Sequence, residues 1–225
     1  MTRISVEKKF DVNPQRTDRV TTVMRMFGVS IDRLKDPFDK LRAGQQTTHA
    51  CTVEVNDGDI VYITGPSGAG KSVILREMQN EIPADERINI EQIVLPADKP
   101  VIDCVGGKGT IDALSLLSYA GLSDVFCMLN APANLSEGQK YRFRLACALA
   151  SDKKFIFADE FCSNLDRITA AVIAYNVRRF AKRNNVTFFL ASSHEDILAD
   201  LQPDVLVVKH FTGPAEVIYK NTNCH

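Results

Sequence analysis

The chain contains the stretch Gly65-Pro66-Ser67-Gly68-Ala69-Gly70-Lys71-Ser72, which decides its fold. An apolar run at residues 60–64 precedes it and a breaker-free run at 73–78 follows, so the sequence predicts strand, glycine-rich loop and helix in that order. Glycines lack a Cβ, so the backbone of this loop can turn its N–H groups inward around a phosphate. The helix that begins near Lys71 adds the positive end of its dipole. The stretch therefore predicts a site for a nucleoside triphosphate.

Two side chains of the loop have distinct expected tasks. Lys71 supplies a mobile cation for the β- and γ-phosphates, and Ser72 supplies a hydroxyl ligand for Mg²⁺. The residues predicted to contact the nucleotide in this region are Gly65, Pro66, Ser67, Gly68, Ala69, Gly70, Lys71, Ser72 and Val73.

Length and composition indicate an ordinary globular protein. The chain has 225 residues, 45% of them hydrophobic and 24% charged, which fits a single domain over 1–225 with a substantial core. The net charge of −1 gives no global attraction to nucleic acid. No apolar run is long enough to cross a bilayer, so we expect a cytoplasmic protein. The six cysteines form no C-x-x-C pair, and reduced thiols are expected.

Three unbroken apolar runs in the second half, at residues 155–158, 186–191 and 205–208, predict buried strands. Helical stretches separate them, which is typical of a parallel sheet covered on both faces. The helix expected over 167–183 has an apolar stripe that we expect to face inward, formed by Ile168, Ala171, Val172 and Tyr175.

The remaining elements are predicted from shorter signals. We expect helices at 17–27, 72–81 and 112–121, and strands at 52–55 and 88–93. Residues 106–109 are rich in glycine but follow no clear strand, so they predict a turn and not a second phosphate loop. Residues 1–50 have no assignable role.

A second motif, Leu135-Ser136-Glu137-Gly138-Gln139, lies just ahead of a helix expected over 140–150. Ser136 and Gln139 have the spacing of a capping box, which leaves the helix N–H groups free to face an anion. By itself the motif also fits a helix that is merely well capped.

Together with the phosphate loop, this motif resembles the signature L-S-G-G-Q of the ATP-binding cassette (ABC) ATPases, with four of five positions matching. The order of the other motifs is similar too. Asp159 resembles the Walker B aspartate, Glu160 the catalytic glutamate, and residues 163–166 the D-loop that ends in Asp166. His194 resembles the switch histidine, and Gln92 is a weaker match to the Q-loop glutamine.

The resemblance implies an α/β fold, that of a P-loop NTPase with a mainly parallel sheet flanked by helices. A reduced helical lobe at about 93–150 would carry the signature motif. The implied cofactors are ATP and Mg²⁺, with the metal held by Ser72, Asp159 and Gln92. The implied catalytic residues are Glu160, Lys71, His194 and Gln92.

In the family the signature helix faces the nucleotide of a second subunit. Carried over, this places Ser136, Gly138, Gln139 and Asp166 against the ATP of a partner copy. Two ATP molecules would then hold two protomers together and hydrolysis would release them, so a nucleotide-dependent homodimer is expected.

The sequence departs from transporter subunits of the family in two ways. Gln92 lies 21 residues after Lys71 and Ser136 lies 44 residues after Gln92, and both stretches are generally longer there. Glu137 also replaces a glycine with a carboxylate near the expected γ-phosphate.

Three functions stay open on the sequence alone. A soluble, non-transport ATPase switch fits the shortened lobe best. The alternatives are the energy-coupling subunit of an ABC transporter, with a membrane permease as partner, and a nucleotide-gated or DNA-associated module with little hydrolysis. For the last, a basic cluster at Arg178, Arg179, Lys182 and Arg183 is the only local signal, and helix-dipole complementation also explains it.

Overall fold

The structure, a computed structural model, describes residues 1–10, 17–26 and 47–220. Its centre is a six-stranded sheet in the order β4-β5-β6-β3-β7-β8. The strands are β3 (Ile60–Thr64), β4 (Arg87–Asn89), β5 (Phe155–Ala158), β6 (Thr187–Ala191), β7 (Val205–Val208) and β8 (Glu216–Tyr219). All neighbours are parallel except β7 and β8. The predicted mainly parallel sheet is confirmed.

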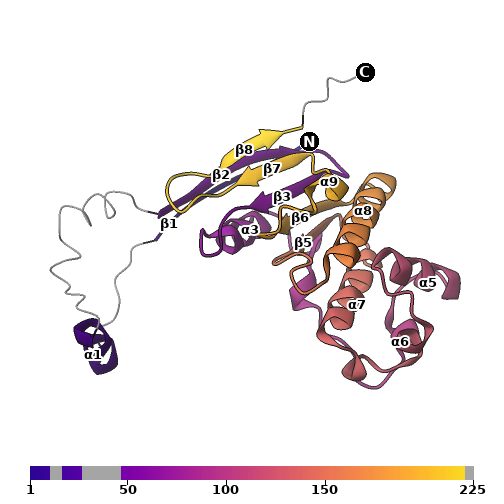
Figure 1. The fold of residues 1–225 in the computed structure, drawn as a ribbon. Coiled ribbons are helices and arrows are strands. Elements are labelled where there is room, and N and C mark those ends of the chain that lie inside the picture. Colours follow the sequence, from indigo (N-terminus) through magenta and orange to yellow (C-terminus); the bar gives the residue numbers. More distant parts are fainter. Residues whose placement is uncertain (11–16, 27–46, 221–225) are drawn as a thin grey trace.

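A separate two-stranded antiparallel sheet pairs β1 (Thr2–Phe10) with β2 (Thr47–Val55). The strand predicted at 52–55 is the end of β2. Figure 1 shows this sheet packed beside β7, β8 and α3 (Lys71–Asn80). The helix predicted at 17–27 is present as α1 (Asp18–Met26), and its last predicted residue, 27, lies outside the described residues.

Side chains of the central sheet alternate between two cores, as a two-residue period requires. Ile60, Tyr62 and Phe188 point into one core, which α7 (Glu137–Leu149) and α8 (Arg167–Asn184) cover. Val61 and Phe189 point into the other, which α3 and the β1–β2 sheet cover. The sheet is therefore buried on both faces, which explains its unbroken apolar strands.

The helical lobe extends from the carboxyl end of β4 to α7 (Figure 1). Its short elements are η2 (Ile90–Gln92), α4 (Val101–Cys104), α5 (Thr110–Tyr119), α6 (Val125–Leu129) and η3 (Pro132–Asn134), and they lead into α7. Residues 106–109 form a loop between α4 and α5, as predicted. Among the described residues, no helix combines the length and the apolar character that crossing a membrane requires.

The strand predicted at 88–93 is wrong beyond residue 89. The side chain of Asn89 accepts a hydrogen bond from the Glu91 amide at 2.9 Å and so caps a 3₁₀ turn at 90–92. Local side-chain capping competes with a strand ladder, and here it ends β4 after three residues.

The inward face predicted for α8 is also wrong. Ile168, Val172 and Tyr175 are 78%, 50% and 50% exposed, and Ala171 is only half-buried. The buried stripe consists of Ala170, Ile173, Ala174, Val177, Phe180 and Ala181. This buried stripe stays apolar to the end of the helix, whereas the predicted stripe continues into Arg179 and Lys182. Burying the predicted stripe would therefore bury two charged side chains.

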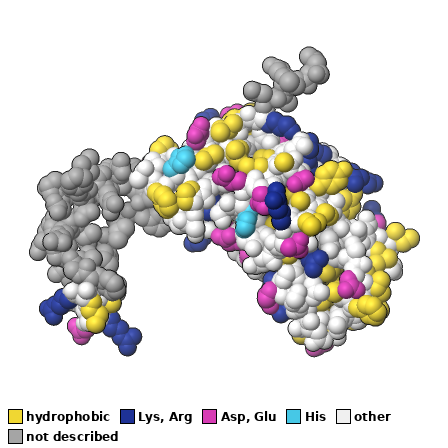
Figure 2. Space-filling model, viewed as in Figure 1, with side chains coloured by type: hydrophobic (Ala, Val, Ile, Leu, Met, Phe, Trp, Pro, Cys, Tyr) yellow, Lys and Arg dark blue, Asp and Glu magenta, His cyan; other side chains and the backbone are white. Residues whose placement is uncertain are grey.

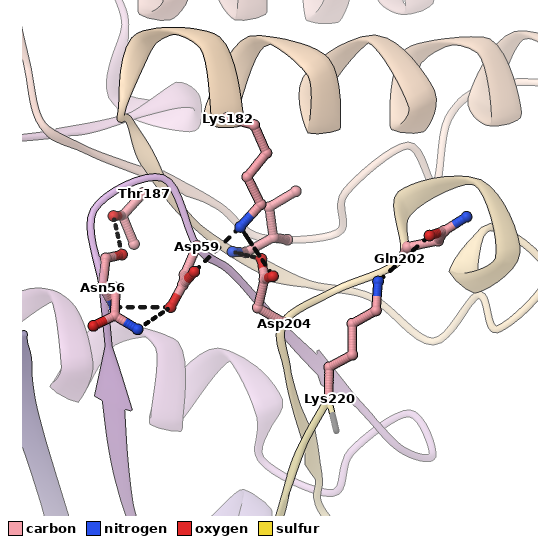
Figure 3. A network of polar contacts seen from close by, with 8 residues as sticks. Asn56, Asp59, Lys182, Thr187, Gln202, Asp204 and Lys220 are labelled. Carbon is pink, nitrogen blue, oxygen red and sulfur yellow. Dashed lines mark hydrogen bonds and ion pairs between the residues drawn. The ribbon is translucent and has the colours of Figure 1, made fainter. Parts of the chain in front are cut away.

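A cluster of polar contacts ties the end of α8 to the starts of two strands (Figure 3). Lys182 Nζ donates to Asp59 Oδ1 at 3.2 Å and to Asp204 Oδ1 at 2.9 Å. Asp59 in turn accepts from the Asn56 amide at 2.8 Å, and Asp204 accepts from the Ile60 amide at 2.9 Å. One member of the basic cluster therefore has a structural task.

Replacing Lys182 with methionine should lower the free energy of unfolding by about 1 kcal/mol, because it leaves two neighbouring carboxylates without their shared cation. Urea unfolding measures this change. Arg183→Met is the matched control, since Arg183 is exposed and forms no ion pair with any described residue. Equal midpoints for the two variants would contradict the assignment.

Candidate functional site

The phosphate loop, the acidic pair and His194 converge because three neighbouring parallel strands end at the same edge of the sheet. β3 leads into the phosphate loop, β5 into Asp159 and Glu160, and β6 into Ser192 and His194. Since β6 lies between β5 and β3, the acidic pair and the phosphate loop flank the strand that carries the histidine.

The phosphate loop, residues 65–72, has the backbone that its glycines predict. Gly65, Gly68 and Gly70 have φ of 140°, 79° and 98°, where side chains are strained. A Cβ on Gly65 would lie 2.0 Å from the Lys209 carbonyl oxygen, and one on Gly70 would lie 2.0 Å from Cε1 of His49. At Gly68 no atom of the described residues lies within 4 Å of that position. Both ends of the loop thus pack closely against other segments, at Gly65 and Gly70, whereas its middle at Gly68 is open.

Lys71 opens α3 and folds back over the loop. Its ammonium group donates to the carbonyl oxygens of Gly65 at 2.9 Å and Pro66 at 3.1 Å, and the residue is buried. These contacts hold the cation at the mouth of the loop, from which it can exchange weak carbonyl partners for phosphate oxygens.

Asp159 and Glu160 leave the end of β5 in an unusual conformation. Glu160 has φ of 46°, a left-handed backbone for a residue with a side chain, as is common at functional sites. Its amide donates to Asp159 Oδ1 at 3.0 Å, and its carboxylate accepts from the Ser163 hydroxyl at 2.9 Å. The two carboxylates therefore have different partners: that of Asp159 accepts from the backbone, and that of the exposed Glu160 is oriented by Ser163.

Glu91, which precedes the expected Q-loop residue, was not among the predicted site residues. Its carboxylate accepts a hydrogen bond from the Asp159 amide at 3.1 Å. Although the residue as a whole is exposed, burial of its acid group raises the pKa of Glu91 to about 7, and the nearby Asp159 adds to the rise. The only sequence signal is its place next to Gln92.

This acidic edge and Ser72 fit a magnesium ion. Carboxylate and hydroxyl oxygens are the ligands Mg²⁺ prefers, and it usually takes one or two carboxylates with phosphates and waters completing the shell.

His194 is held through its backbone. Its amide donates to Ser192 Oγ at 3.2 Å, and its carbonyl oxygen accepts from the hydroxyl of the buried Tyr62. The half-exposed imidazole lies 3.9 Å from Asp196, which also lies 3.8 Å from Arg167 at the start of α8. The imidazole is thus partly open to solvent, and its expected contact with a γ-phosphate stays a prediction.

The capping box predicted at the start of α7 is confirmed. The Ser136 hydroxyl accepts from the Gln139 amide at 3.3 Å, and the Gln139 side chain accepts from the Ser136 amide at 2.9 Å. The other end of the Gln139 side chain donates to Cys127 Sγ at 2.9 Å. Gln139 is predicted to contact a nucleotide, but both polar atoms of its side chain form hydrogen bonds within the chain.

The signature motif lies against the D-loop. A Cβ on Gly138 would lie 3.3 Å from Leu165 Cδ2, so this glycine allows a close approach. Asp166 caps α8 by accepting from the Thr169 amide at 3.0 Å, and these bonds hold the pKa of Asp166 below its usual value. Among the described residues, the hydrogen bonds of Ser136 and Gly138 go to helix neighbours and not to the phosphate loop.

Glu137, the departure from the signature, forms an ion pair with Lys140 at 2.9 Å, which lowers the pKa of Glu137. Its charge is therefore partly balanced on its own helix. Gln92 is exposed beside it in a groove of about 500 Å³ between residues 91–97 and α7. Gln92 forms no side-chain hydrogen bond with the described residues, so its expected metal contact stays a prediction.

Comparisons with known proteins agree with this geometry. No family model matches the chain. The methionine import ATP-binding protein MetN of Streptococcus agalactiae serotype III (strain NEM316) is 25% identical over 221 residues, and that of Vibrio vulnificus (strain YJ016) is 28% identical over 217 residues. The alignments cover 81% and 80% of this chain but only 62% and 61% of those relatives, so the chain spans less than two thirds of their length.

Solved structures share the fold. A dimeric post-hydrolysis state of the ATP-binding cassette MJ0796 bound to ADP and Pi superposes with a TM-score of 0.60 at 20% identity, covering 76% of this chain and 91% of that one. CbiO1 from Clostridium perfringens, part of the ABC transporter complex CbiONQ, gives 0.55 at 16% identity, covering 74% and 79%.

The two ends of the phosphate loop should tolerate a side chain differently from its middle. We expect Gly65→Ala to cost about 3 kcal/mol of unfolding free energy, because its Cβ meets a backbone carbonyl. Gly68→Ala should cost about 1 kcal/mol, the backbone strain alone. Urea unfolding of both variants measures the difference, and a costlier change at Gly68 would contradict the described loop.

Proposed function

Because the chain is an ABC-type ATP-binding domain, we propose that it binds MgATP at residues 65–73 and hydrolyses it. The observation that carries this proposal is the convergence of the phosphate loop, the acidic pair and His194 on one sheet edge. Phosphoryl transfer needs mainly positioning and charge stabilisation, and this edge supplies both.

Each residue has a task that its position supports. The loop amides and Lys71 neutralise the phosphates, and Ser72 with Asp159 would hold Mg²⁺, which spreads the charge that develops on the phosphate oxygens. Glu160, oriented by Ser163, takes the proton of the attacking water or orients it. His194 contacts the γ-phosphate, and Gln92 approaches from the groove when nucleotide is bound.

We propose further that two copies enclose two ATP molecules. Ser136 and Gly138 of one copy would meet the phosphates on the other, with Asp166 at the interface. The exposure of Ser136 and Asp166 supports this arrangement, because neither faces the phosphate loop of its own chain. The dimeric state of MJ0796 is a precedent in the same fold.

The preference for a soluble, non-transport switch does not hold up against the comparisons, which favour the transporter alternative. The relatives are import ATP-binding proteins, and CbiO1 belongs to a transporter complex. We therefore propose that the chain energises a membrane permease. The shortened lobe still supports the non-transport switch as a second candidate.

The surface offers a place for a permease. Val94, which lines the groove beside Gln92, is 91% exposed, and Lys140 and Arg144 also line this groove. Figure 2 also shows hydrophobic side chains on the lobe, where Ile111, Phe126 and Leu129 are 83%, 81% and 65% exposed on α5 and α6. Exposed apolar groups near a polar groove are typical of protein docking sites.

Glu160→Gln should bind MgATP without turnover, because the neutral amide cannot take a proton, and should accumulate as a dimer. Lys71→Ala should bind at least about 100-fold more weakly and stay monomeric. Sedimentation velocity with and without MgATP measures both, with Arg183→Ala as the control. A Glu160→Gln variant that stays monomeric in saturating MgATP would contradict the dimer.

Docking to a permease should place the protein in the membrane fraction of its native cells. Val94→Glu should reduce that fraction at least about threefold by placing a charge in the groove. Ile218→Glu is the matched control, on β8 and away from the groove. Wild-type protein found entirely in the supernatant would favour the non-transport switch.

A further inference from the structure

A side chain of the β1–β2 sheet reaches the phosphate loop. His49 of β2 is only 5% exposed, and its imidazole lies behind Gly70 at the end of the loop where α3 begins. We infer that His49 is a positioning residue for the phosphate loop, through which the β1–β2 sheet sets the affinity for nucleotide. This inference rests on the proposed binding of MgATP at the loop.

The contact between ring and loop leaves no room. A Cβ at Gly70 would lie 2.0 Å from Cε1, 2.5 Å from Nδ1 and 3.1 Å from Nε2 of His49. The ring therefore approaches the backbone of Gly70 most closely with its Cε1 atom. Gly70 has φ of 98°, and a packed ring behind it resists relaxation of that conformation.

The β1–β2 sheet has the rigidity that such a support needs. Its inward side chains, Ile4 and Val53 among them, share a core with Ile74 and Met78 of α3. Lys8, the register partner of His49 on β1, forms an ion pair with Glu77 of α3. The same sheet thus holds the phosphate loop and the helix that follows it.

The opposite end of the loop has a different kind of support. Gly65 packs on the backbone carbonyl of Lys209, just after β7. The ammonium group of Lys209 is buried and donates to the carbonyl oxygens of His210 at 2.6 Å and Gly213 at 2.8 Å. Burial, followed by the charge of Lys209, lowers the pKa of His49, so a neutral ring agrees with its place. Of the two supports at Gly65 and Gly70, the one from His49 is made by a side chain and can be removed by substitution.

The support should act on binding and much less on turnover. Without the ring, the loop amides can leave the geometry that faces the phosphates, and binding must restore it at a cost in ordering. Glu160 and His194 follow other strands, β5 and β6, so once nucleotide is bound the reacting groups are unchanged. If His49 had only a structural role, its substitution would lower the melting temperature without weakening nucleotide binding selectively over turnover.

The test measures MgATP affinity by isothermal titration calorimetry, with kcat and melting temperature, on the full chain. His49→Ala should raise Kd at least about 10-fold and change kcat less than about threefold. His49→Gln, which keeps reach and polarity, should recover most of the affinity. Lys182→Met is the control, because it removes a stabilising contact far from the loop and should leave Kd unchanged.

A double-mutant cycle tests the contact itself. Gly70→Ala should weaken binding severely because its Cβ meets the ring, and adding His49→Ala should partly restore binding. The inference would be overturned if the Kd increases of Gly70→Ala and His49→Ala simply multiplied in the double variant. It would also be overturned by wild-type affinity in His49→Ala, or by a rise of Kd in Lys182→Met equal to that in His49→Ala. If the wild-type protein binds no MgATP, the proposed function fails and the inference on His49 fails with it. If the wild-type protein binds MgATP and His49→Ala binds it equally well, only the inference on His49 fails.

Discussion

The structure depends on one constraint: the phosphate loop, residues 65–72, must keep a backbone with three positive φ angles. The three positive-φ glycines make the conformation possible but do not stabilise it. Its stability comes from neighbours, because the carbonyl of Lys209 closes against Gly65 and the ring of His49 against Gly70. The middle, at Gly68, is left open for a ligand. Order of the loop thus depends on β7 and β2, which lie far from it in the sequence.

The order of the central sheet brings the remaining chemistry to this loop. β6 lies between β3 and β5, so the carboxylates and the histidine reach the same edge. Ser163 joins the two sides, since its hydroxyl donates to Glu160 and lies 3.5 Å from the Ser192 hydroxyl. The D-loop then continues to Gly138 of the signature helix. A change at the acidic pair therefore has a packed route to the surface expected to meet a second copy.

Local patterns predicted much of this arrangement. The phosphate loop, the capping box at Ser136 and the three central strands depend on residues near each other in the chain, so the sequence was sufficient. The face of α8 was wrong because the predicted stripe was chosen from the first half of the helix, whereas only the other stripe stays apolar over the full length. Glu91, His49 and Lys209 were missed because their roles come from contacts between distant elements. β1 and β8 were missed since their edge positions leave weak patterns.

The most direct measurement of the central claim is a crystal structure of the Glu160→Gln protein with MgATP. The account predicts one triphosphate held between the phosphate loop of one copy and Ser136 of another, with the serine hydroxyl within hydrogen-bonding distance of the γ-phosphate. A structure in which Ser136 lies far from every phosphate, in its own copy and in all neighbours, would contradict it.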